Sequence, residues 1–246
     1  MPEPKYQRIA AELKADIAAG KYGPGDRLPG ENDLMAAHRV ARMTARQALG
    51  VLRGEGIAEA RKGAGVFVRS LPPLRRQSVQ RLAREGWGAG KSIWSTETSG
   101  RDLAIDQVTV GEQPAPERVA GLLGVEAGAV VCLRSRRFVL DRRPVLLSDS
   151  YLPAVLVAGS AITRPNTGPG GTYARLAELG HAPVRFREEV RSRIITDEEA
   201  VRLELASGTP VLLVCRTAFT DSGHAVEVNE MVMDAAAYVL EYDFDA

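Results

Sequence analysis

Several residue types that enzymes and secreted proteins depend on are scarce in this chain of 246 residues, which holds two cysteines, three histidines and 5% aromatic residues. The thiols of Cys132 and Cys215 cannot form the spaced ligand sets of structural zinc, and both lie in apolar, strand-like runs, so we expect reduced core residues. No apolar run approaches the ~18 to 20 residues of a membrane span, and the N-terminus lacks the apolar segment of a secretory signal. The sequence therefore predicts a cytoplasmic protein with no membrane partner and no metal site.

Motifs for catalysis are also missing from the sequence. The histidines His38, His181 and His224 are scattered along the chain, and no Gly-x-Ser-x-Gly element, phosphate-binding loop or metal cluster occurs. The acidic pair Glu188-Glu189 is typical of a solvated face. We therefore expect no catalytic residue and no cofactor, although a small-molecule enzyme stays the competing class.

Charge is distributed unequally along the chain, although the formal net charge is only +1. Residues 1–92 contain 17 Lys and Arg against 9 Asp and Glu, whereas residues 93–246 contain 15 against 22. A basic front part and an acidic rear part indicate different partners, and a polyanion is the natural partner of the first. The length of the chain allows one large domain or two ordinary ones.

The front part has the pattern of helices followed by a β-hairpin. Apolar residues spaced by three and four predict helices over residues 6–19, 31–38 and 42–53. A loop with the sequence PGDRLPGENDL joins the first two helices, and its Gly30 can cap the second. Two short apolar segments, residues 57–61 and 66–69, flank a basic, glycine-rich tip and predict the hairpin. This order is typical of a winged helix-turn-helix, a DNA-binding architecture.

The third predicted helix presents the chemistry that DNA recognition needs. Arg46 and Gln47 project away from its apolar face, with Arg42 and Thr44 at the flanks. Guanidinium groups on this face can bond phosphate oxygens or the O6 and N7 atoms of guanine. The glycines of the hairpin tip let backbone N–H groups approach a phosphate closely. The sequence therefore predicts double-stranded DNA as a partner.

The segment from Tyr6 to Val68, with the motifs PGDRLPGENDL, RMTARQAL and GAGVFV, resembles the DNA-binding domain of GntR-type bacterial transcription regulators. The sequence departs from the family pattern at Gly30, where Ser is usual, and at Ala41, where the recognition helix usually has a Ser or Thr cap. The resemblance implies base or phosphate contacts from the third helix and minor-groove contacts from the hairpin tip. The implied DNA-binding residues are Arg27, Gly30, Glu31, Arg42, Thr44, Arg46, Lys62, Gly63 and Gly65.

Behind the front domain, residues 1–70, we expect a linker over residues 71–92 and a second domain over residues 93–246. The linker is rich in Pro, Gly and Arg, and its arginines contact either DNA or water. The second domain mixes strands, hairpin turns and helices, which indicates an antiparallel α+β fold. Expected strands cover residues 129–139, 144–151, 186–195, 210–218 and 225–233, and expected helices cover residues 116–123, 172–179 and 197–205.

Three stretches of the second domain, LGVEAGAVVCLRSRRFVLDRRPVLLSDSYLP, GTYARLAELG and GTPVLLVCRTAFTDSGHAVEVNEMVM, resemble the UTRA effector-sensing domain of the HutC branch of GntR regulators. The resemblance implies a fold similar to chorismate lyase, so an enzyme of that fold with a vestigial DNA-binding head is the alternative. For any one arginine of the strands, a salt-bridged surface, a subunit interface and an anion clamp remain open. The implied effector-binding residues are Arg136, Ser148, Thr172, Tyr173, Glu189, Arg191 and Glu227.

Together these features predict a ligand-responsive transcription repressor. We expect a homodimer whose two recognition helices enter successive major grooves of an inverted-repeat operator. A small-molecule effector, with an anion among the candidates, would shift the equilibrium between two spacings of the DNA-binding heads.

Overall fold

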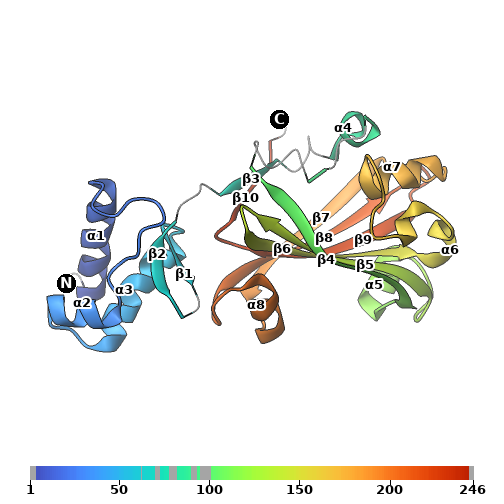
Figure 1. Cartoon of the computed structure of the whole chain (residues 1–246). Coiled ribbons are helices and arrows are strands. Elements are labelled where there is room, and N and C mark those ends of the chain that lie inside the picture. Colours follow the sequence, from blue (N-terminus) through green and yellow to red (C-terminus); the bar gives the residue numbers. More distant parts are fainter. Residues whose placement is uncertain are drawn as a thin grey trace. The chain divides into compact units, whose positions relative to one another are not determined.

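The computed structural model describes residues 4–61, 63–69, 73–77, 82–89, 93–94 and 101–243. The chain divides into two compact units, with the main boundary after Pro73 (Figure 1). Each unit has its own buried apolar clusters. Within the described ranges, no helix is both long enough and apolar enough to cross a membrane.

The first unit is a winged helix-turn-helix, as predicted. Its apolar cluster joins Leu13 of the first helix to Leu34 and Leu52 of the next two, which is why these short helices hold together. The turn before the third helix is closed by Arg39, whose φ of 49° is unusual for a residue other than glycine. Its elements are α1 (Lys5–Ala18), α2 (Glu31–His38), α3 (Arg42–Gly54), β1 (Ala58–Arg61) and β2 (Gly65–Val68).

The loop PGDRLPGENDL lies along the hairpin and pairs with β2 through an isolated bridge between Arg27 and Phe67. Gly25 N–H donates to the carbonyl of Val68, and Leu28 N–H donates to the carbonyl of Val66. The side chain of Leu28, whose N–H makes the second bond, is buried in the apolar cluster. The loop is therefore fastened to the hairpin on one side and opens α2 on the other.

The second unit is built on a six-stranded antiparallel sheet with the order β4-β5-β6-β9-β8-β7, which confirms the predicted α+β class. Strand β4 was not expected, because it is an edge strand that mixes polar and apolar residues and carries a register shift between Asp106 and Thr109. Its strands are β4 (Leu103–Pro114), β5 (Val130–Leu140), β6 (Arg143–Pro153), β7 (Arg185–Ile194), β8 (Pro210–Phe219) and β9 (Ala225–Asp234).

Helices cover both faces of this sheet. On one face, α4 (Arg84–Gly88), α6 (Ala154–Val157), the 3-10 turn η3 (Ala161–Thr163) and α7 (Gly171–Glu178) pack against a cluster that includes Cys132 and Leu152. On the other face, α5 (Glu117–Leu123) packs against Val131 and Val228. The helix α8 (Asp197–Leu203) is joined to β5 by a hydrogen bond that the Arg137 guanidinium donates to the backbone carbonyl of Arg202. Cys132 and Cys215 are free and buried, as expected.

The stretch 71–92, expected to be a linker, contains regular structure. Strand β3 (Leu74–Gln77) pairs in parallel with β10 (Tyr238–Glu241), and α4 follows. Arg75 forms an ion pair with Glu241, at 2.6 Å between Nη1 and Oε2. Arg76 is completely buried, so neither DNA nor water, the two expected partners, surrounds it.

Candidate functional site

On the first unit, the exposed arginines of α3 are held by a carboxylate at the start of α2. Glu31 accepts a hydrogen bond of 2.7 Å from Arg46 Nε and one of 3.3 Å from Nη2. Arg42 Nε lies 3.7 Å from the same carboxylate. The bond from Arg46 holds the pKa of Glu31 below its ordinary value. Glu31, expected at the DNA interface, thus orients the two guanidinium groups that can reach bases or phosphates.

Arg27 and the hairpin tip form a second basic part of this unit. Arg27 lies in an isolated bridge with Phe67 of β2. Gly65 has a φ of 118° that a larger residue would resist, and a Cβ there would lie 3.0 Å from Arg27 Nε, so that the arginine side chain would have to shift. Gly63 is exposed at the tip, and Lys62 lies outside the described residues.

The starts of α2 and α3 are capped without side-chain oxygens at the cap position. Gly30 has an extended backbone, and its N–H donates to Asp33 Oδ2 at 2.9 Å. Ala41 offers no side-chain cap to α3, where Thr44 is half-buried in the first turn. Thr44 N–H donates to the Ala41 carbonyl, and the N–H groups before it, which no cap side chain bonds, can donate to an anion such as a phosphate.

On the second unit, a cavity of about 370 Å³ opens on the face of the sheet that carries α7. Strand alternation directs side chains of β5, β8 and β9 into it, among them Arg136, Arg216, Glu227 and Asn229. The loop before α7 forms its rim, where Gly170 has a φ of 78° that a larger residue would resist. The cavity therefore combines buried cations, a carboxylate and the start of a helix.

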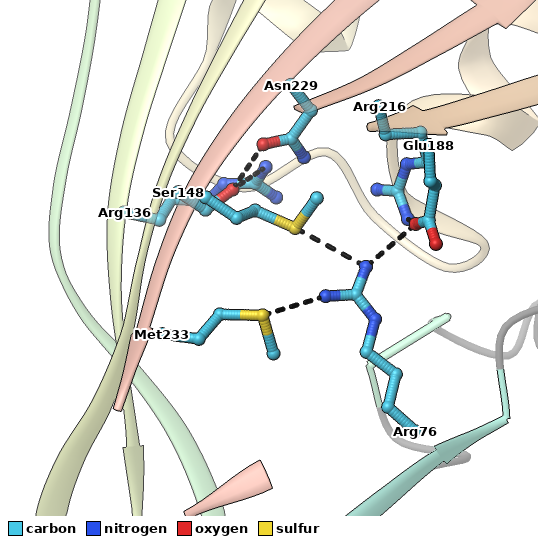
Figure 2. Close-up of polar contacts among 8 residues, drawn as sticks. Arg76, Arg136, Ser148, Glu188, Arg216, Asn229 and Met233 are labelled. Atoms are coloured by element: carbon cyan, nitrogen blue, oxygen red, sulfur yellow. Dashed lines mark hydrogen bonds and ion pairs between the residues drawn. The ribbon is translucent and has the colours of Figure 1, made fainter. Parts of the chain in front are cut away.

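Arg136 and its neighbours form a polar network on the floor of this cavity (Figure 2). Arg136 Nη2 donates to Ser150 Oγ at 2.8 Å and to Ser148 Oγ at 3.4 Å, and Ser148 Oγ donates to Asn229 Oδ1 at 2.9 Å. Burial lowers the pKa of Arg136 to about 10, so the group stays charged at neutral pH.

Several buried atoms of this cavity lack a hydrogen-bond partner among the described residues. Among them are Arg136 Nε, Glu227 Oε2 and Asn229 Nδ2. Buried polar atoms are nearly always bonded in folded proteins, and each unbonded one carries a desolvation penalty. A cation, a carboxylate oxygen and an amide donor facing one cavity indicate a site for a polar ligand.

Arg134 also lies in the wall of this cavity, but its guanidinium bonds the backbone of the rim. Its guanidinium donates to the backbone carbonyls of Ile162, Arg164 and Pro165. These bonds hold the segment before α7 over the sheet. Arg134 therefore shapes the rim, whereas the adjacent inward arginine, Arg136, faces the cavity.

The expected effector residues are not all brought together. Arg136, Thr172, Tyr173 and Glu227 line the cavity, with Ser148 bonded to Arg136 beneath it. Two others, Glu189 and Arg191, line a separate hollow of about 600 Å³ that also includes Arg118, Glu230 and Arg193. The separation follows from strand alternation on β7, where Glu188 and not Glu189 faces the cavity side.

That second hollow is lined by mutually paired charges. Arg118 bonds Glu230 and reaches Glu189 at 3.4 Å, and Arg193 Nη2 lies 2.6 Å from Glu199. Among the described residues, no group of three or more His, Cys, Asp and Glu could hold a metal ion. Among the described residues of the larger hollow, Asp149 Oδ1 is a buried atom without a hydrogen-bond partner, but the smaller cavity has more such atoms and is therefore favoured as the ligand site.

Trp94, Arg216 and Asn229 are among the cavity residues that sequence reasoning missed. A signal existed for Arg216, because a lone arginine interrupts the apolar run PVLLVCRTA of its strand. Glu188 was also missed, since its side chain is buried and not solvated as its acidic neighbourhood suggested.

Comparisons with known proteins agree with both units. Residues 5–68 match the family described as bacterial regulatory proteins, gntR family, and residues 98–239 match the UTRA domain. An uncharacterised HTH-type transcriptional regulator of Streptomyces coelicolor is 32% identical over 98% of this chain and 93% of its own length. The HTH-type transcriptional repressor NagR of Bacillus subtilis is 27% identical over 99% of this chain and 96% of its own. The crystal structure of PhnF from Mycobacterium smegmatis has a TM-score of 0.62 at 25% identity, covering 97% of this chain and 99% of that one.

Proposed function

Because the chain belongs to the GntR family of bacterial regulatory proteins and carries a UTRA effector-binding domain, we propose that this DNA-binding transcription regulator is a cytoplasmic, homodimeric repressor. Family membership confirms the predicted regulator and leaves the enzyme with a vestigial DNA-binding head without support. Two similar proteins, NagR and a fructoselysine utilization operon protein of Shigella flexneri, are named repressors. A dimer would place its two recognition helices on an inverted-repeat operator.

The DNA contacts follow from the exposed chemistry of the first unit. Arg42 and Arg46 of α3 would read bases or phosphates in the major groove, and Thr44 and Arg27 would contact phosphates. The hairpin tip, with Gly63 and Gly65, would approach the minor groove. Gly30 and Glu31 would act at the start of α2, where Glu31 sets the two arginines.

The effector would bind in the 370 Å³ cavity. The observation that supports this is the set of unbonded buried atoms, Arg136 Nε, Glu227 Oε2 and Asn229 Nδ2. Arg136 and the start of α7 at Thr172 suit an anionic group, whereas Glu227 accepts from a hydroxyl or ammonium group. We therefore expect a small anionic metabolite that also carries a hydrogen-bond donor. Its binding would shift the dimer toward a state with lower operator affinity.

Two measurements test this proposal. A gel shift with the DNA upstream of the protein's own gene is expected to show binding at low salt, and no shift there would refute operator recognition. A thermal-shift screen of small anionic metabolites on the wild-type protein is expected to give a hit that weakens the gel shift. The thermal shift from this metabolite should be lost in Arg136→Ala and kept in Arg191→Ala, a matched change in the other hollow. The reverse result would place the effector site in the other hollow.

A further inference from the structure

Arg76 of β3 is a buried cation just behind the unit boundary. Its Nη2 donates to Glu188 Oε1 at 3.0 Å, and its Nη1 approaches Met233 Sδ at 3.1 Å (Figure 2). Met231 Sδ lies 3.5 Å from Nη2. Thioether sulfur is a weak acceptor, whereas a carboxylate carries a full charge. Glu188 is therefore a strong partner that keeps this arginine, and with it β3, docked on the sheet.

The same carboxylate also serves the cavity. Glu188 on β7 is the cross-strand partner of Arg216 on β8, and Arg216 Nη1 lies 3.8 Å from Glu188 Oε1. Arg216 lines the cavity, and its guanidinium lies 5.8 Å from the Trp94 ring, which the guanidinium of Arg76 approaches to 5.9 Å. One buried carboxylate thus stands between two buried guanidinium groups, one in the cavity and one on β3.

We propose that Glu188 is a positioning residue that couples occupancy of the cavity to the docking of β3; this rests on the proposed function of the cavity as an anion site. Among the described residues of this cluster, the buried cations Arg76, Arg136 and Arg216 outnumber the carboxylates Glu188 and Glu227. An anion beside Arg216 takes over part of the charge that Glu188 balances. The Glu188 carboxylate then interacts mainly with Arg76, and β3 is held more tightly on the sheet.

The coupling must act in both directions, because binding linkage is reciprocal. A docked Arg76 draws Glu188 away from Arg216 and leaves that guanidinium more available to an anion. Removing Arg76 therefore weakens anion binding although this residue does not line the cavity. Removing the charge of Glu188 has the opposite effect on binding, since a competing carboxylate disappears. A purely structural role would make both changes harmful, whereas a non-additive double variant distinguishes coupling from the independent fields of two opposite charges.

The test uses the full-length protein with inorganic phosphate as the probe. Affinity is measured by calorimetry, and docking of β3 by hydrogen–deuterium exchange of residues 74–77 with and without phosphate. We expect Arg76→Gln to lower phosphate affinity and Glu188→Gln to raise it, each by about fivefold or more. The double variant should bind like Glu188→Gln alone, because Arg76 acts on the cavity through the Glu188 carboxylate; binding like the wild type would mean that the two changes are additive and uncoupled. Phosphate should slow exchange of β3 only in the wild type and in Glu189→Gln, the matched change on the opposite face.

Four outcomes overturn the proposal or the site beneath it. If Arg76→Gln and Glu188→Gln weaken phosphate binding alike, the pair is structural and the coupling is refuted. The coupling is also refuted if β3 of Glu188→Gln keeps its response to phosphate. If the wild type binds no phosphate, the anion preference of the cavity is wrong. In that case the role of Glu188 in docking β3 is tested by hydrogen–deuterium exchange without ligand. The amides of β3 should then exchange about tenfold faster in Glu188→Gln than in Glu189→Gln. Equal exchange rates in the two variants would reject the role of Glu188.

Discussion

Arginine is used in opposite ways on α3 of the first unit and in the cavity of the second. On α3, the side chains of Arg42 and Arg46 are 61% and 60% exposed and share a surface carboxylate. In the second unit, Arg136 is 9% exposed and Arg216 only 1%. Exposed ion pairs of the first kind contribute little to stability, so their guanidinium groups can leave Glu31 for a phosphate at small cost. A buried guanidinium has already lost its water and needs a partner of fixed geometry.

The difference matters for what each unit can recognise. Exposed arginines on a helix suit a polyanion whose charges extend along a surface, and salt screens such interactions. Buried arginines around a cavity suit one small anion that is enclosed by the protein. Each prediction below changes one side of this comparison and leaves the other side as its control.

The largest expected effect is that of salt on operator binding. If a dimer makes six to ten phosphate contacts, raising salt from about 50 to about 200 mM should lower operator affinity by about 10³ to 10⁵. Binding of a small anion in the buried cavity should change far less over the same range. Gel shifts and calorimetry at matched salt concentrations measure both quantities. Equal salt slopes for DNA and effector would remove the distinction between the two kinds of arginine.

Truncation of the cavity arginine comes second. Arg136→Ala should lower affinity for the anionic effector by about 2 to 5 kcal/mol, because it removes a buried charged partner. Operator binding without effector should be unchanged. Calorimetry with the screening hit and a gel shift measure the two effects, and an unchanged melting temperature of the free variant checks its fold. Arg191→Ala, which alters an exposed arginine of the other hollow, should leave effector affinity as it is.

Loss of one arginine on α3 should have a smaller effect. Arg46→Ala is expected to cost about 1 to 3 kcal/mol of operator binding if this guanidinium bonds a guanine. Affinities for operator and for random DNA of the same length give the discrimination. A loss of equal size on both sequences would show that Arg46 contacts a phosphate and reads no base.

The fold was predictable from the sequence wherever the apolar residues recur with the period of a helix or a strand and so mark one buried face. The helices of the first unit and the central strands β5, β6, β8 and β9 have such patterns. Strand β4 was missed because an edge strand is solvated along one side and needs no continuous apolar face. Strand β3 was missed because its partner β10 lies more than 160 residues away, and proline and arginine in its neighbourhood resemble a linker.

The site was less predictable, since it depends on which alternate residues of each strand face α7. The family resemblance placed Arg136, Tyr173 and Glu227 around the cavity that the structure contains. On β7 the acidic pair leaves the choice between Glu188 and Glu189 open, and only the pairing with β8 decides it. Local sequence gives no information on that register, because a shift by one residue exchanges the two faces.

The smallest expected effect concerns the carboxylate that holds the α3 arginines. Glu31→Gln should raise affinity for random DNA by about 0.5 to 1 kcal/mol, since a competing negative charge is removed. Operator affinity should rise less, because Arg46 loses the partner that sets its direction, so discrimination falls. The bond from Arg46 keeps the pKa of Glu31 below its ordinary value, so the carboxylate is charged at neutral pH. It becomes protonated, and its stabilising charge is lost, only when the pH falls through that lowered pKa. The difference between variant and wild type should therefore be constant from about pH 6 to 8. A difference that changes within this window would mean that another titrating group, and not Glu31, controls the arginines.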